Sequence, residues 1–216
     1  MTDHDQWTGI SDLETLTALL GEPAPAVRDK ARSSLTEVDV AWLEASPFCV
    51  VATSSAAGGA DASPKGDPTG QLVHVIDATT IALAERPGNR RADGYRNILE
   101  NPHVGMLFLI PGRGDTLRIN GRARLVSDAP FFDDLVVKGH RPLLAMVVEI
   151  DELFHHCAKA FLRSKLWEPE SWDPEAVVAR RAVLAQKLER PEASVDELDL
   201  YYGPSYADGL YRNPGA

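Results

Sequence analysis

The sequence predicts a mainly β fold of the α+β class, built on an antiparallel barrel or sandwich with flanking helices. Short β-rich runs follow one another between positions 48 and 150, separated by clusters of Gly, Pro and Asp. Helical spacing of apolar residues is confined to the two ends and to one stretch inside this β-rich part. Strands that follow one another with close turns indicate antiparallel pairing rather than alternating βαβ units.

Six runs carry the strand signal, namely residues 48–53, 71–76, 80–84, 104–110, 116–126 and 143–150. The turn-rich residues 54–61 predict a hairpin after the first run. One helix is predicted inside the barrel, at residues 92–100, because an acidic residue lies near its start and Asn101-Pro102 follows it.

Both ends of the chain are predicted to be helical. Leucines recur at helical spacing from Leu13 to Leu20, and a second helical segment begins near Ala26. Residues 174–187 predict another helix, and Ser194 with a glutamate three positions later is typical of a helix N-terminus. We therefore divide the chain into an N-terminal helical extension (1–45), a β-barrel domain (46–170) and a C-terminal helical extension (171–216).

Composition excludes several classes of function. The 216 residues are 44% hydrophobic and 25% charged, which suits a globular domain. The formal net charge of −10 argues against a general binder of nucleic acid or anionic membranes, which needs a basic surface. With only two cysteines, no signal-peptide pattern and no apolar run of about 18 residues, we expect a cytoplasmic protein without disulfides.

Three polar segments are candidates for a binding site. The first, Ser63-Pro64-Lys65-Gly66-Asp67, reads on its own as a solvated loop. The second, residues 85–93, carries three arginines into a helix N-terminus, which suits either an anion site or a basic surface turn. In the third, residues 115–124, Thr116 and Arg118 share one strand face, as a half-solvated strand would also require.

The order and spacing of these segments resemble a family. Ser-Pro-Lys-Gly-Asp, Arg-Pro-Gly-Asn-x-Arg-x-Asp and Thr-Leu-Arg-Ile-Asn-Gly occur in the order seen in the pyridoxamine 5'-phosphate oxidase-like split barrels. The resemblance covers roughly residues 40–170. It implies an antiparallel split β-barrel that works as a homodimer and binds FMN in a groove between the two subunits.

The resemblance also implies the flavin contacts. It places the residues 63–66 beside the isoalloxazine ring and ribityl chain, the turn after Pro87 near the phosphate, and Thr116 and Arg118 on a later strand of the site. The cofactor-binding residues that it implies are Ser63, Pro64, Lys65, Gly66, Asn89, Arg90, Arg91, Asn97, Thr116 and Arg118.

A fourth segment, residues 155–167, follows the last predicted strand. Consecutive side chains diverge, so His155, His156 and Cys157 are not expected to converge on a metal ion. We interpret Cys157 as a small buried hydrophobic residue. In the family branch this segment approaches the flavin, and the contacts that the resemblance implies there are Lys159, Arg163 and Ser164.

The expected function is an FMN-dependent oxidoreductase acting on an unidentified small molecule. Lys65 or Arg118 would stabilise negative charge on the reduced ring, and the catalytic residues remain unknown. Two alternatives stay open: a flavin carrier or sensor without turnover, and a split barrel that uses F420 or haem. Pyridoxamine 5'-phosphate is not the expected substrate, since Asp115-Thr116 stands where the oxidases have Arg-Gln.

Overall fold

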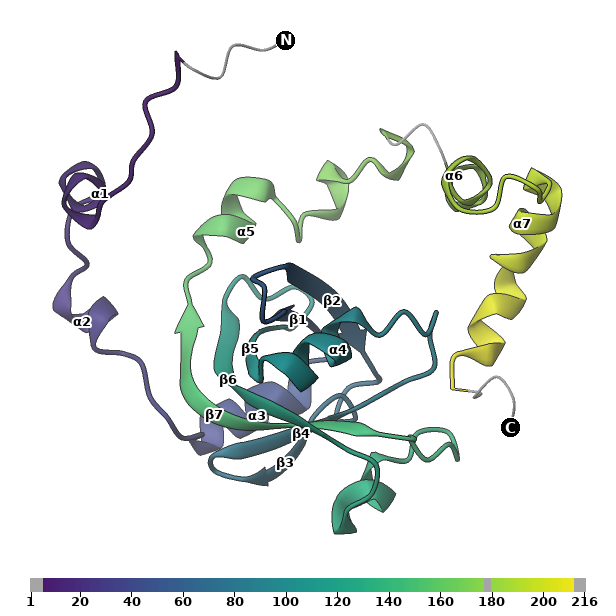
Figure 1. Cartoon of the computed structure of the whole chain (residues 1–216), viewed down its shortest axis with the longest axis horizontal. Coiled ribbons are helices and arrows are strands. Elements are labelled where there is room, and N and C mark those ends of the chain that lie inside the picture. Colours follow the sequence, from purple (N-terminus) through teal and green to yellow (C-terminus); the bar gives the residue numbers. More distant parts are fainter. Residues whose placement is uncertain (1–5, 177–179, 212–216) are drawn as a thin grey trace. The chain divides into compact units, whose positions relative to one another are not determined.

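Seven antiparallel strands form one open sheet in the computed structural model, which describes residues 6–176 and 180–211 (Figure 1). The strands are β1 (Phe48–Ser54), β2 (Ala60–Gly66), β3 (His74–Asp77), β4 (Thr80–Ala84), β5 (His103–Leu109), β6 (Thr116–Val126) and β7 (Ala145–His156). Their order is β2-β1-β5-β6-β7-β4-β3. Within the described ranges no pairing joins the edge strands β2 and β3, so the predicted α+β fold with a split antiparallel barrel is confirmed.

Short helices accompany the sheet. The α-helices are α1 (Leu13–Leu20), α2 (Pro25–Arg28), α3 (Glu37–Ala45), α4 (Asp93–Glu100), α5 (Lys159–Ser164), α6 (Arg181–Leu188) and α7 (Val195–Tyr201). Turns of 3-10 helix occupy Pro130–Leu135, Pro169–Ser171, Pro174–Ala176 and Pro204–Gly209. None of the helices in the described part of the chain has the length and apolarity needed to cross a membrane.

The chain divides into two compact units, residues 1–31 and 32–216. In the first unit α1 begins at a cap, because the Asp12 carboxylate accepts a hydrogen bond of 2.7 Å from the Thr15 backbone N–H. In the second unit α3 belongs to the barrel: its Trp42 and Leu43 are buried in the same core as the sheet residues Phe108 and Ile119. The barrel unit therefore includes a helix that the sequence grouped with the N-terminal extension.

Most predicted elements lie close to their predicted bounds. The hairpin of β1 and β2, the helix α4 and the N-cap at Ser194 are all confirmed, and Glu197 completes a capping box there. The solvated-loop interpretation of residues 63–66 is wrong, because they lie in β2. An edge strand accommodates Pro64, which has no N–H to donate to a second neighbour. The predicted helix 174–187 is observed only from Arg181, and its residues 177–179 lie outside the described residues.

Strand β7 is longer than predicted and pairs with β6 as far as His156. The register shifts between Asn120 and Gly121, where the strand carries a bulge. A Cβ atom on Gly121 would lie 2.2 Å from the Glu149 carbonyl oxygen, so only glycine fits this close approach.

Candidate functional site

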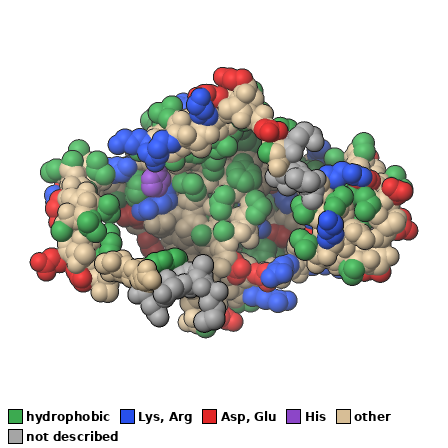
Figure 2. Space-filling model, turned by 90° about the horizontal axis from the view of Figure 1, so that it is seen from above, with side chains coloured by type: hydrophobic (Ala, Val, Ile, Leu, Met, Phe, Trp, Pro, Cys, Tyr) green, Lys and Arg blue, Asp and Glu red, His purple; other side chains and the backbone are tan. Residues whose placement is uncertain are grey.

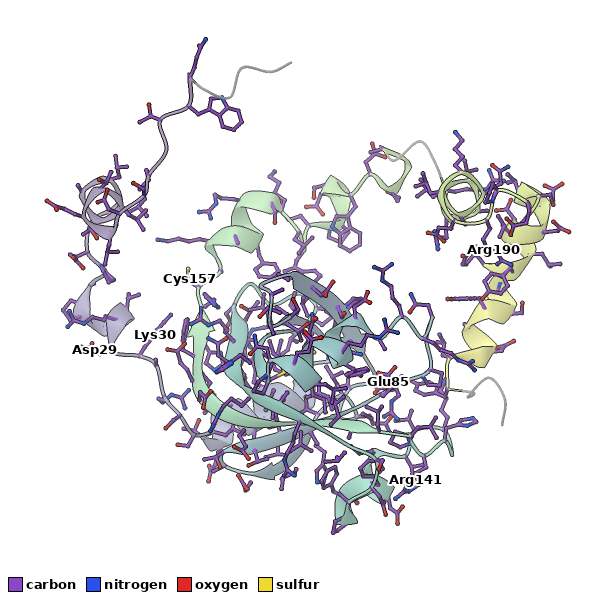
Figure 3. All side chains as sticks on the ribbon, viewed as in Figure 1. Asp29, Lys30, Glu85, Arg141, Cys157 and Arg190 are labelled. Carbon is purple, nitrogen blue, oxygen red and sulfur yellow. The ribbon has the colours of Figure 1, made fainter. Side chains whose placement is uncertain are left out.

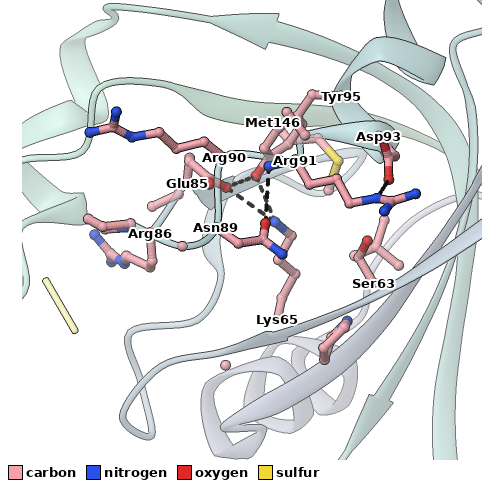
Figure 4. A pocket seen from close by; sticks show the side chains of 18 of the residues that line it. Ser63, Lys65, Glu85, Arg86, Asn89, Arg90, Arg91, Asp93, Tyr95 and Met146 are labelled. Carbon is pink, nitrogen blue, oxygen red and sulfur yellow. Dashed lines mark hydrogen bonds and ion pairs between the residues drawn. The ribbon is translucent and has the colours of Figure 1, made fainter. Parts of the chain in front are cut away.

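A pocket of about 650 Å³ opens between β2, the loop after β4 and the first turn of α4 (Figure 4). Its volume lies in the range of small-molecule and cofactor sites. The apolar part of its wall comes from buried core residues, namely Val51, Leu72, Ala84, Ile98 and Met146. The rest of the wall is polar, and the pocket therefore combines an apolar surface with many charged groups.

Strand β2 contributes one row of side chains to the pocket. Its half-buried positions alternate with exposed ones, as expected for a strand with one covered face. Asp61, Ser63 and Lys65 occupy the half-buried positions, and Asp67 follows them directly after the strand. Pro64 and Gly66 also line the pocket but occupy the exposed positions at its edge.

Lys65 is held by two residues from other elements. Its Nζ lies 3.2 Å from the Glu85 carboxylate and 2.8 Å from the Tyr95 hydroxyl, and that hydroxyl also donates to Glu85 (Figure 4). Burial, with help from Glu85, raises the pKa of Tyr95 above its usual value. Tyr95 therefore stays a neutral donor at physiological pH.

Arg91 lies just before the start of α4, in the part of the pocket wall opposite Lys65. Arg91 forms an ion pair with Asp93, and its backbone N–H donates to the Asn89 side chain (3.0 Å). The N-cap residue of α4, Ala92, makes no side-chain hydrogen bond to the first N–H groups of this helix. A helix N-terminus of this kind, together with an arginine, favours an anion.

Asn97 lies one layer below the pocket. It is buried and donates hydrogen bonds to the Thr53 hydroxyl (3.0 Å) and the Asp61 carboxylate (2.8 Å), both of which line the pocket. The predicted contact residue Asn97 is thus observed as a support for two wall residues.

A second buried ion pair lies at the far end of the β2 row. The Arg86 Nε is 2.7 Å from the Asp67 carboxylate, and the Asp67 side chain is 2% exposed. The Arg86 Nη1 donates to the Leu135 carbonyl oxygen (3.0 Å), which fixes the guanidinium from two sides.

Seven of the predicted cofactor-binding residues come together in this pocket: Ser63, Pro64, Lys65, Gly66, Asn89, Arg90 and Arg91. The Arg90 side chain points away from Lys65 in Figure 4, and its backbone is left-handed (φ 60°), as is that of Ala92. The polar wall residues absent from the predicted set include Asp67, Glu85 and Tyr95. Asp67 ends the Ser-Pro-Lys-Gly-Asp motif and Glu85 begins the polar segment 85–93, so both carried a signal, whereas Tyr95 carried no local signal.

The remaining predicted residues lie elsewhere in the barrel unit. Thr116 is buried, and Arg118 forms an ion pair of 2.6 Å with Glu152 while its guanidinium lies 4.1 Å from the centre of the Phe154 ring. Lys159, Arg163 and Ser164 lie on α5 with exposed side chains. These five residues do not line the pocket of their own chain.

The segment after β7 contains one corrected expectation. Cys157 is exposed rather than buried, because it follows the last paired residue of β7 and precedes α5 (Figure 3). His155 instead points to α3, where its Nε2 lies 3.0 Å from the buried carboxylate of Asp39. In the described part of the chain no three His, Cys, Asp or Glu side chains form a metal-binding group.

The charges of the pocket are largely matched. Three of the cations that line it, Lys65, Arg86 and Arg91, form ion pairs with Glu85, Asp67 and Asp93, respectively. Basic and acidic side chains are likewise interspersed on the surface seen in Figure 2. A ligand of this pocket therefore meets fixed dipoles and shared charges rather than a strongly basic surface.

An open antiparallel sheet with an amphipathic pocket beside its edge strand is a split barrel with a cavity of the size that small molecules occupy. The model of the pyridoxamine 5'-phosphate oxidase family matches residues 35–157, which is more than half of the chain. The chain belongs to this family.

Three solved structures with a similar chain path illustrate the range of the similarity. HupZ of Group A Streptococcus is 17% identical, with a TM-score of 0.46 over 56% of this chain and 93% of its own. An F420 reductase is 18% identical (TM-score 0.42; 56% and 98% covered), and an FMN-binding protein of Syntrophomonas wolfei is 14% identical (TM-score 0.41; 55% and 88% covered). No curated protein matches the chain. The family assignment depends on the family model alone.

Proposed function

We propose that this protein is an FMN-dependent oxidoreductase that acts on a small molecule, with one FMN in the pocket beside β2. The observation that carries the proposal is the division of the pocket into an anion end and a ring end. Arg91, Asn89 and the N-terminus of α4, which has no side-chain cap from Ala92, lie at one end. Lys65, paired with Glu85, lines the pocket further along β2.

The residues present fit FMN. A phosphate suits the anion end, because charge-assisted hydrogen bonds from arginine and helix N–H groups are the strongest that a protein offers to it. The Ser63 hydroxyl, near Arg91 in Figure 4, is a donor for the same end. A flat ring suits the apolar wall, which includes Leu72 and Met146.

When bound, FMN would supply the redox chemistry. Lys65 would then hold positive charge beside the ring, at a position that Glu85 and Tyr95 fix. A fixed cation stabilises negative charge that develops on the ring without the cost of reorienting water. The neutral Tyr95 hydroxyl, which accepts from Lys65 and donates to Glu85, would keep Lys65 in place.

We further propose that two copies form the complete site, because the other predicted contacts lie on a different face. The register places Pro64, Val50, Leu107, Arg118 and Phe154 in one row across β2, β1, β5, β6 and β7, on the face opposite the core. Apart from the exposed Pro64, these residues are half-buried. An apolar row of this kind, which begins at the pocket edge, suits a second copy that contributes Arg118 and the α5 residues.

Two measurements test the proposal. The visible spectrum and mass of the ligand that copurifies should identify FMN, and light scattering should report a dimer at micromolar concentration. A spectrum typical of F420 or haem would show that this ligand, and not FMN, is the cofactor. A flavin-bound monomer would contradict a site shared between two copies. Anaerobic reduction by NADH or NADPH, followed by a screen of acceptors, separates an enzyme from a carrier that binds flavin without turnover.

A further inference from the structure

The C-terminal tail reaches the ligand pocket. Leu210 and Tyr211 line it together with Met146 and with residues that precede them by more than a hundred positions. The Tyr211 hydroxyl donates a hydrogen bond of 2.9 Å to the Asp67 carboxylate. The tail therefore contributes a side chain to a wall that otherwise comes from the barrel.

The partner of Tyr211 is also held by residues of the barrel unit. Asp67 accepts from Arg86 through its other oxygen (2.7 Å), and the Arg86 guanidinium is in turn held by the Leu135 carbonyl group. With Tyr211 in place, the Asp67 side chain is 2% exposed and that of Arg86 is 14% exposed. Burial, followed by the hydrogen bond to Asp67, raises the pKa of Tyr211, which keeps its hydroxyl a donor.

Two cations flank the ring of Tyr211. The Arg86 guanidinium lies 5.7 Å from the ring centre and the Lys138 Nζ lies 5.5 Å from it. Both distances lie within the range of cation–π attraction. The ring is thus held by its edge hydroxyl and by the charges beside it, although it is only half-buried.

Tyr211 lies away from the anion end of the pocket. Its hydrogen-bond partner Asp67 follows β2 directly and comes four residues after Ser63. Extended backbone of that length places Asp67 about 13 Å from Ser63. Ser63 lies near Arg91 at the entrance to α4, and Lys65 lies between the two ends (Figure 4). The tail residue therefore closes the end of the pocket that lies beyond Lys65.

We propose that Tyr211 is a ligand-binding residue that provides an aromatic wall for the isoalloxazine ring at this end of the pocket. This inference rests on the proposed function, because it takes FMN as the ligand. Aromatic side chains bind flat rings by offset stacking or edge contact, and this one needs no new anchor when the ligand enters. The C-terminal extension thus forms part of the binding site.

The test compares Tyr211→Leu with Tyr211→Phe and with the control Tyr206→Leu. Tyr206 is an exposed tail residue that packs on Tyr201 and Tyr202 and does not line the pocket. Dissociation constants for FMN and for riboflavin are measured by flavin fluorescence. Tyr211→Leu should weaken both ligands by the same factor, roughly five- to twentyfold, because the lost contact is to the ring.

Tyr211→Phe keeps the ring and loses only the bond to Asp67, so its loss should be smaller, roughly two- to fivefold. Tyr206→Leu should bind both ligands as the wild-type protein does. Wild-type affinity in both Tyr211 variants would overturn the inference while leaving the proposed function intact. A loss confined to FMN would also overturn it, and a wild-type protein that binds neither ligand would overturn both proposals.

Discussion

The Nζ of Lys65 lies 2.8 Å from the Tyr95 hydroxyl, which joins the edge strand β2 to the helix α4 across the pocket. Because Glu85 accepts from both groups, the charge of Lys65 is fixed in place and partly balanced. Lys65→Met should make the reduction potential of bound FMN more negative, and Glu85→Gln should make it more positive. We expect each potential to shift by about 30 mV, which corresponds to about 1.4 kcal/mol for a two-electron couple.

Anaerobic titration of the FMN-loaded variants measures these potentials. Lys187→Met, which removes an exposed lysine at the end of α6, is the matched control and should leave the potential unchanged. Shifts of the same sign in Lys65→Met and Glu85→Gln would show that the charge of Lys65 does not act on the ring.

Arg91 should distinguish FMN from riboflavin. Arg91→Ala removes a charge-assisted contact to the phosphate, and such contacts contribute about 1.5–3 kcal/mol. We expect FMN to bind roughly ten- to a hundredfold more weakly, with riboflavin almost unaffected. Isothermal titration of both ligands measures this, with Arg141→Ala as the control, since Arg141 pairs with Asp128 and Asp133 outside the pocket. Equal losses for both ligands would exclude Arg91 as a phosphate ligand.

Pyridoxamine 5'-phosphate should be a poor substrate. Asp115, at the position where the oxidases have an arginine, has a pKa lowered by hydrogen bonds from Arg113 and is therefore charged at neutral pH. A carboxylate there repels the substrate phosphate, and a lost bidentate contact costs orders of magnitude in efficiency. Oxygen consumption measures the rate, and a kcat/KM of about 10⁴ M⁻¹s⁻¹ or more would contradict this prediction.

Asp39 should control the acid stability of the barrel. Its burial alone would raise its pKa, but hydrogen bonds from Arg32, from Thr36 and from His155 outweigh burial and hold the pKa well below its usual value. The stability that this lowered pKa contributes is present above the usual pKa of about 4 and is lost as the pH falls through the folded-state value.

Asp39→Asn should therefore lower the free energy of unfolding at pH 7 by about 3 kcal/mol and flatten its pH dependence below pH ~4. This loss lies at the lower end of the range measured when one partner of a buried ion pair is removed, because the Arg32 side chain is 38% exposed. Urea unfolding at several pH values measures both effects. Asp29→Asn, in an exposed pair with Arg28, is the control, and an Asp39→Asn protein with wild-type stability at pH 7 would refute the prediction.

The fold was predictable where local patterns repeat. Alternation identified the strands around β6, and Asn101-Pro102 marked the end of α4. The full length of β7 was not predictable, because its second half carries acidic and histidine residues without a clear apolar alternation. These residues extend the strand because they pair with β6. The packing of α3 into the barrel core likewise follows from the tertiary position of Trp42 and Leu43.

The part of the site that belongs to sequence motifs was predictable. Ser63, Lys65 and Arg91 belong to motifs, and the structure brings them to one pocket. Glu85, which follows β4, and Tyr95 in α4 meet Lys65 of β2 only in the folded chain. Tyr211 follows Asp67 by 144 residues in the sequence. Contacts of such sequence separation leave no local pattern to read.

We expect the pocket beside β2 to bind FMN. The most direct measurement is a titration of the flavin-free protein with FMN, followed by the absorbance of the bound flavin, with Arg91→Ala and Arg141→Ala in parallel. We predict one FMN per chain, wild-type affinity in Arg141→Ala and a loss of roughly tenfold or more in Arg91→Ala. Absence of FMN binding by the wild-type protein, or equal affinity in all three proteins, would contradict it.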